Sequence, residues 1–186
     1  MFLLRKPAAE DVRRFIAGQR DLPFSYREVG ATKTIPPDWY NLDHNRVCLG
    51  KGRETFMRAS EALGRWRHFE LGWAAVVPQG TPMQTGSVVA VQAHTFGMWS
   101  LNACRIVYTI NEQAKFGYAY GTLADHAERG EERFMIEILD DDSVWYDILA
   151  FSRPQKFIVR LGRPLARRLQ RRFARDSMAV MKRLAA

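Results

Sequence analysis

The sequence predicts an α+β protein in which an antiparallel sheet of about seven strands packs on a long C-terminal helix, with two shorter helices near the N-terminus. Aromatic and β-branched runs separated by turn residues fill the stretch from Trp66 to Phe151, which is typical of a meander. Apolar residues then recur every four positions from Leu165 to Met181. Because apolar residues make up 47% of 186 residues, we expect one domain spanning residues 1–186.

The N-terminal part predicts two helices and one strand. Pro7 favours a helix start at Ala8, and Gly18 marks its end, with acidic residues in the first turn. The alternation in Phe24–Val29 predicts a short strand. Helical spacing of apolar residues predicts the second helix over Gly52–Leu63.

Six further strands are predicted from apolar runs between turn signals. Alternation along them places aromatic or aliphatic residues on one face, as in Phe116, Tyr118 and Tyr120, or in Phe134, Ile136 and Ile138. One face of the sheet is therefore expected to be buried throughout. The predicted strands are Phe69–Val77, Ser87–Phe96, Ser100–Ile110, Phe116–Leu123, Arg133–Leu139 and Val144–Phe151.

The C-terminal helix is expected to begin near Gln155, to be interrupted at Gly162 and to restart at Pro164. Between Arg153 and Arg183 lie eleven Lys and Arg residues and one acid, a net charge of +10 in a chain of net charge +8. Such a stripe suits phosphates or an anionic membrane surface. Alternatively it is solvated or paired with Glu61, Glu70 or the acids between 131 and 142. Nucleic acid has no further support, because no helix-turn-helix, zinc-finger or RNA-binding strand motif occurs.

Several classes of protein are disfavoured by what the chain lacks. It contains no Gly-x-Gly-x-x-Gly, no phosphate loop and no Gly-x-Ser-x-Gly, so no cofactor is expected. Cys48 and Cys104 have no metal-ligand spacing and are expected to be buried reduced thiols. The N-terminus lacks the layout of a secretory signal, and no apolar run reaches 18 residues. A soluble, cytoplasmic protein is expected.

Several unusual clusters occur in one order along the chain. They are Leu49-Gly-Lys-Gly52, Phe69-Glu-Leu-Gly-Trp73, Cys104-Arg-Ile-Val-Tyr108, Tyr120-Gly-Thr-Leu123, His126-x-Glu128-x-Gly130-Glu-Glu132, Val144-Trp-Tyr146, Phe151-Ser-Arg-Pro154, Leu161-Gly-Arg-Pro164 and Gln170-Arg-Arg-Phe173. This set of clusters resembles a bacterial and plant family known as a domain of unknown function.

The predicted order of elements also resembles the helix-grip plan, in which a curved antiparallel sheet wraps the terminal helix. The resemblance implies similarity to the START-like, birch-allergen-like (SRPBCC) superfamily, whose members hold apolar or amphipathic ligands between sheet and helix. It implies no catalytic residue and no cofactor.

Six residues are candidates for lining a ligand cavity. If Val88, Ala90, Gln92, His94 and Phe96 face inward, Gln92 and His94 place polar groups in an apolar wall. Tyr108, Tyr118 and Tyr120 offer ring area and a hydroxyl each. Trp145 and Arg153 lie in or at the end of the last strand, where Arg153 could hold an anion. For each there is a structural alternative: a core histidine, cross-strand packing, or an ion pair from Arg153 to Glu131 or Glu132, which we favour.

The segment between Leu123 and Arg133 is the richest in acid and base groups. His126, Glu128 and Glu131 are the candidate catalytic residues, since a His and nearby carboxylates can bind a metal or transfer a proton. The alternative is a solvated loop paired with the basic helix. The His-x-Glu spacing also occurs in zinc deaminases, but the Pro-Cys-x-x-Cys segment they require is absent, and no metal site is predicted.

The sequence thus supports three hypotheses. The first is a protein that binds a small apolar or amphipathic ligand between the sheet and the C-terminal helix. The second is an enzyme that acts on such a ligand through His126 with Glu128 or Glu131. The third, which is weaker, is docking of the basic helix to nucleic acid or anionic lipid.

Overall fold

The computed structural model describes residues 1–34, 36, 38–124, 126, 128–154 and 163–186. Along the chain, its elements are first strands that alternate with two helices, then a long meander, and then a final helix. In order they are β1 (Phe2–Leu3), α1 (Ala9–Gln19), η1 (Ala31–Lys33), β2 (Asn41–Lys51), α2 (Gly52–Gly64), η2 (Arg67–Phe69), β3 (Ala74–Val77), β4 (Val88–Thr95), β5 (Met98–Asn111), β6 (Lys115–Thr122), β7 (Glu128–Ile138), β8 (Ser143–Pro154) and α4 (Arg163–Ala185).

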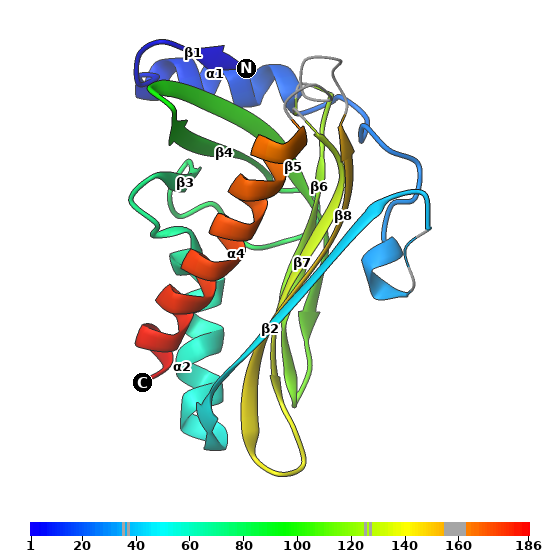
Figure 1. The fold of residues 1–186 in the computed structure, drawn as a ribbon, viewed down its shortest axis with the longest axis vertical. Coiled ribbons are helices and arrows are strands. Elements are labelled where there is room, and N and C mark those ends of the chain that lie inside the picture. Colours follow the sequence, from blue (N-terminus) through cyan, green and yellow to red (C-terminus); the bar gives the residue numbers. More distant parts are fainter. Residues whose placement is uncertain (35, 37, 125, 127, 155–162) are drawn as a thin grey trace.

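All strands join one antiparallel sheet in the order β2-β8-β7-β6-β5-β4-β3, with β1 paired to the start of β5. The stretch from β3 to β8 is the predicted meander. In the described residues the sheet has eight strands, against about seven expected. α2 and α4 pack on one side of the curved sheet, which we call the inner face (Figure 1). The opposite side is the outer face.

The N-terminal strand prediction was wrong. Phe24 makes only an isolated bridge to Leu123, and Ser25 bonds to Thr122, after which the chain crosses the outer face as a strap. We call residues Phe24–Thr34 the outer strap. The sequence reading missed two strands, the short β1 and the edge strand β2, which pairs along its length with β8. Its alternating burial leaves polar residues exposed, so its hydrophobic signal is weak.

Two strand boundaries also differ from the prediction. Residues 67–69 form a 3-10 turn and β3 begins only at Ala74, so the strand predicted over Phe69–Val77 is half as long. β7 begins at Glu128 instead of Arg133. Gly130 enables this extension, because its φ is +155° and an added Cβ would lie 1.9 Å from the Phe151 carbonyl oxygen.

The face assignments on β6 and β7 are confirmed. Tyr118 and Tyr120 of β6, with Phe134 and Ile136 of β7, lie in the main core cluster on the inner face. On β4 the assignment was wrong, since Val89 and Val91 contact that cluster while Val88 and Ala90 pack under α1 on the outer face. α1 packs on the outer face of β4 and the main core lies against its inner face, so both of its parities are apolar and hydropathy does not distinguish them.

The two early helices match their predictions to within one residue at each end. α4 is described from Arg163, with Pro164 in its first turn as expected; the predicted beginning near Gln155 and the interruption at Gly162 lie outside the described residues. Its buried stripe comprises Ala174, Ser177, Val180, Met181 and Ala185, whereas Leu165 remains exposed. The C-terminal half of α4 is therefore the part that packs tightly on the sheet.

Within the described residues, no helix has the length and apolar character needed to cross a membrane.

Candidate functional site

Aromatic rings fill the part of the inner face that lies under the C-terminal half of α4. Tyr118, Phe134 and Tyr146 are fully buried, and their rings surround His68 of η2 at centroid distances of 4.8 to 6.4 Å. The His68 Nε2 lies 2.8 Å from the Tyr118 hydroxyl, and burial lowers the pKa of His68 to about 3. Tyr118 is thus a core residue. Side chains fill the space under the C-terminal half of α4, where a ligand cavity was expected.

The inner face is more open under the N-terminal half of α4. Here the Tyr120 hydroxyl donates a 2.7 Å hydrogen bond to Glu132. Protein atoms closely surround Glu132, although part of its surface stays accessible. Burial, with smaller contributions from Asp43 and Glu128, raises the pKa of Glu132 to about 7. This carboxyl is therefore close to half protonated at neutral pH.

Two further carboxylates connect this region to α4. The Gln170 amide donates to Glu128 at 2.7 Å and to the Ser152 hydroxyl at 3.2 Å. Arg167 forms a two-pronged ion pair with Asp43 of β2. Burial raises the pKa of Glu128, against the opposing effect of its hydrogen bonds and of Arg167. We call Asp43, Glu128 and Glu132 the acid cluster.

His126 lies beside the acid cluster but is held by the backbone. Its Nδ1 accepts the Glu128 N–H at 3.0 Å, which places the ring proton of the neutral imidazole on Nε2. Burial lowers the pKa of His126 to about 4, so the ring is neutral at pH 7. Within the described residues, no group of three His, Cys, Asp or Glu side chains has an arrangement that could hold a metal ion.

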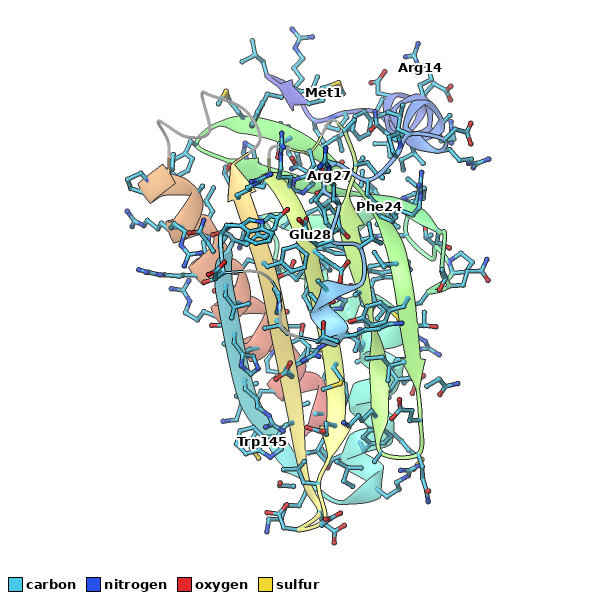
Figure 2. The ribbon with its side chains drawn as sticks, turned by 90° about the vertical axis from the view of Figure 1, so that its right-hand side faces the viewer. Met1, Arg14, Phe24, Arg27, Glu28 and Trp145 are labelled. Atoms are coloured by element: carbon cyan, nitrogen blue, oxygen red, sulfur yellow. The ribbon has the colours of Figure 1, made fainter. Side chains whose placement is uncertain are left out.

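Glu131 lies on the outer face, away from His126 and Glu128. Its carboxylate accepts hydrogen bonds from the Tyr26 hydroxyl at 2.7 Å, from the Gly30 N–H at 2.7 Å, and from both the N–H and the hydroxyl of Thr32. Figure 2 shows the outer strap, with Phe24, Arg27 and Glu28 labelled, in front of the sheet on this side. Successive residues of a strand point to opposite faces, so grouping Glu131 with Glu128 as acid–base partners was wrong.

Tyr108 and Trp145, both predicted to bind ligand, also lie on the outer face. A register shift between Ile106 and Tyr108 turns Tyr108 outward, where its hydroxyl lies 2.7 Å from that of Thr32. Trp145 stacks under Arg46, 4.8 Å from its guanidinium carbon. Both residues therefore stabilise the outer surface, and of the three predicted tyrosines only Tyr118 and Tyr120 face inward.

His94 and Arg153, the other two candidates, are exposed. His94 stacks on Trp99 with ring centroids 4.5 Å apart, on the face opposite the main core. Arg153 lies over the Tyr40 ring at 5.2 Å. The ion pair from Arg153 to Glu131 or Glu132 that we favoured is not found among the described contacts, since tyrosine and threonine groups satisfy both carboxylates.

A pocket of about 510 Å³ opens at the edge strand β3, beside the junction of sheet and helix. We call it the Trp73 pocket. Four aromatic side chains and three cations contribute to it, with Glu70 as its one acidic residue. It is lined by Lys6, Arg65, Trp66, Arg67, Phe69, Glu70, Gly72, Trp73, Ala74, Ala75, Val76, Gln79, Gly80, Gln92 and Trp99.

The aromatic walls of the Trp73 pocket are fixed by the rest of the fold. The Trp73 indole N–H donates to Asp176 of α4 at 3.0 Å, and Arg172 covers the ring at 4.5 Å. Phe69 forms the inner wall, and its ring reaches Phe173 of α4 at 5.0 Å and Tyr120 at 6.5 Å. The pocket thus adjoins the residues that surround Glu132. Sequence reasoning missed it, although the tryptophans 66, 73 and 99 were a signal.

The rim of the pocket carries an excess of positive charge. Arg67 pairs with Glu70 at 3.1 Å and Arg65 pairs with Glu61 at 2.8 Å, but the ammonium of Lys6 contacts the Trp99 ring at 5.6 Å. These pairs are exposed, so water and salt screen them. An anionic group on a ligand would meet a favourable potential here.

The fold is similar to solved structures of low sequence identity. A hypothetical protein, jhp0584, from Helicobacter pylori aligns with a TM-score of 0.57 at 14% identity, covering 88% of this chain and 96% of the other. The protein Ara h 8.0201 aligns with a TM-score of 0.50 at 11% identity, covering 78% of this chain and 97% of the other. Together with the sheet that wraps α4, these likenesses identify a helix-grip fold.

Sequence relatives come from three distant lineages. A UPF0548 protein of Dictyostelium discoideum is 36% identical over 97% of this chain and 94% of its own length. UPF0548 proteins of Deinococcus radiodurans and Arabidopsis thaliana are 35% and 37% identical, covering 100% and 80% of this chain and 99% and 75% of their own lengths. The model of the family described as "Domain of unknown function (DUF1990)" matches residues 25–180. The chain therefore belongs to the DUF1990 family.

Proposed function

We propose that this protein binds a small amphipathic molecule at the junction of the sheet and α4, with an apolar part in the Trp73 pocket and an anionic group at its cationic rim. The observation that carries the proposal is the pocket itself. Its volume of about 510 Å³ lies within the ordinary range for small-molecule sites, and its four aromatic side chains provide apolar surface beside the charged rim.

The acid cluster supports a longer site. Between the Trp73 pocket and Glu132 stand the rings of Phe69 and Phe173, and Phe173 is only partly buried. A ligand that extends along α4 past these rings would reach the Tyr120–Glu132 pair, whose proton can be donated or accepted near pH 7. In this proposal Tyr120 and Glu132 orient a neutral polar end of the ligand.

The experiment is a fluorescence titration with the amphipathic anion 8-anilinonaphthalene-1-sulfonate at pH 7. Trp73→Ala should weaken binding about tenfold, because it removes one aromatic wall worth roughly 1–1.5 kcal/mol. Trp145→Ala is the matched control, since that indole lies on the outer face, and it should change affinity less than twofold. Equal affinities of the two variants, with both still folded by circular dichroism, would rule out the Trp73 pocket as the site.

A second candidate function is acid–base catalysis on the bound molecule. The position of Glu132 favours it, and Glu132 replaces Glu131 as the candidate carboxyl group. A carboxyl with a pKa of about 7 next to a tyrosine hydroxyl is suited to proton transfer. In this alternative His126 and Glu128 act next to Glu132 on the inner face. It requires that a captured ligand be converted by the wild type and left unchanged by Glu132→Gln.

We also propose a cytoplasmic location, which suits the two free thiols of Cys48 and Cys104.

A further inference from the structure

Four large apolar side chains are exposed together at one end of the molecule. They are Phe2 (59% exposed), Leu4 (85%), Phe96 (65%) and Met98 (44%), and we call them the hairpin patch. Single exposed apolar residues are common, but a contiguous group of them marks an interaction surface.

Strand pairing explains why the four side chains are neighbours. Phe2 pairs with Ser100 and Leu3 with Trp99, so the same antiparallel register continued by one residue places Leu4 beside Met98. Met98 in turn pairs with Thr95 across the β4–β5 turn, which Phe96 and Gly97 form. Leu3 packs against the α1 cluster. The alternation of β1 therefore turns Phe2 and Leu4 away from that cluster.

The turn itself is not arranged for stability alone. Phe96 has a φ of +53°, a conformation that costs a bulky residue free energy, and its ring gains little burial in return. A residue such as Asn or Gly would suit this position better. The exposed ring is an unexplained cost unless it contacts something outside the molecule.

Positively charged side chains lie beside the hairpin patch. Arg5 and Lys6 follow Leu4 directly and are exposed. The His94 N–H donates to the Trp73 carbonyl at 2.7 Å, and Arg172 of α4 covers the Trp73 ring, so the basic side of α4 adjoins the base of the hairpin. In Figure 1, β1 and the N-terminal end of α4 occupy the same half of the molecule. Exposed cations lie next to Leu4 in the chain, at Arg5 and Lys6, and along α4, at Arg168, Arg171, Arg172 and Arg175, with Asp176 paired to the last two.

We propose that the hairpin patch inserts into the headgroup region of an anionic lipid bilayer, with the surrounding Lys and Arg side chains neutralising lipid phosphates and carboxylates. Apolar side chains that enter the interface, ringed by cations, are the arrangement by which peripheral proteins bind such surfaces. A nucleic acid would use the cations and leave the four apolar side chains without a role. Lys6 and Trp99 line the Trp73 pocket and adjoin the patch, so the docked pocket would open near the membrane.

The test is co-sedimentation of the full chain with vesicles of phosphatidylcholine containing 30% phosphatidylserine, in 0.1 M salt. The wild type should bind these vesicles, bind pure phosphatidylcholine at least tenfold more weakly, and dissociate as salt is raised. The double variant Phe96→Ser/Met98→Ser should lose at least tenfold in partitioning. Met57→Ser/Leu139→Ser removes two exposed apolar residues elsewhere and should bind like the wild type.

A second measurement does not depend on loss of binding. The emission of Phe96→Trp should shift to shorter wavelength when anionic vesicles are added, whereas that of Leu139→Trp should stay unchanged. Absence of binding to anionic vesicles, equal partitioning of the two double variants, or binding only to single-stranded or double-stranded oligonucleotides would each overturn the proposal.

Discussion

Glu131 and Glu132 are neighbours in sequence, but their side chains lie on opposite faces of the sheet and have different hydrogen-bond partners. Among the described contacts, the carboxylate of Glu131 accepts hydrogen bonds from Tyr26, Gly30 and Thr32, under the outer strap. Glu132 faces α4 with one described donor, the Tyr120 hydroxyl, and burial raises its pKa to about 7. A single alternation of the strand therefore separates a structural carboxylate from a group able to exchange a proton.

Glu132→Gln should remove from the pH profile of stability the contribution that decreases as pH rises. The pKa of Glu132 rises from 4.5 to about 7 on folding, so the folded state binds its proton more tightly. This stabilisation is complete below pH 4.5 and is lost as pH rises through 7, by up to about 3 kcal/mol. Urea unfolding of both proteins from pH 5 to pH 8 measures their free energies of unfolding. The value of the variant relative to that of the wild type should increase with pH.

The buried histidines do not disturb this comparison. His68 and His126 have lowered pKa values, so they destabilise the fold as pH falls below about 6.5, but they do so equally in both proteins. Parallel pH profiles of the wild type and Glu132→Gln would contradict the assignment.

At the residue scale, the sequence indicated which side chains could line a site but not toward which face of the sheet each one points. Tyr108 shares the spacing of an inward tyrosine until the bulge after Ile106 reverses it. His94 lies in a strand that is covered on both faces. Its environment therefore depends on how far along the strand α1 extends. These outcomes depend on contacts between distant segments, which local patterns do not contain.

At the element scale, the outer strap is held mainly by polar contacts. Beyond Glu131, Arg133 donates to the Thr32 carbonyl at 3.0 Å and pairs with Asp147 at 2.8 Å. The apolar contribution comes from Tyr26 and Tyr40 packing on Phe151. The strap alternates as a strand would, yet it crosses the sheet, and among the described residues its strand-like pairing is limited to the bridge between Phe24 and Leu123. This is the physical reason that Phe24–Val29 was predicted as a strand.

Glu131→Gln should destabilise the protein by about 2–4 kcal/mol, because an amide accepts fewer of these hydrogen bonds and brings donors that have no partners. Trypsin should then cleave faster at Arg27 and Lys33. The control is Glu137→Gln, which removes pairs to the exposed Arg46 and Lys115 and should cost less than about 1 kcal/mol. Chemical unfolding gives both values, and equal losses would show that the strap does not depend on Glu131.

At the scale of the whole molecule, stability should follow the strand order. β6, β7 and β8 are paired on both sides and contact the main core, whereas β3 is a short edge strand beside the Trp73 pocket. We expect amide hydrogen exchange to be slowest in β7 and fastest in β3, because local opening of an edge exposes little buried surface. Mass spectrometry of peptides measures this, and equal protection of β3 and β7 would contradict it.

By itself, the sequence determined the α+β class, the meander, both early helices, the basic amphipathic α4 and the family, since these depend on local periodicity, turn residues and motif order. Only the tertiary structure decided which carboxylate faces α4, where a pocket remains and which apolar residues stay exposed. Those properties arise where β2, the outer strap and η2 contact strands that are distant in the sequence, and such contacts leave no periodic pattern in the chain.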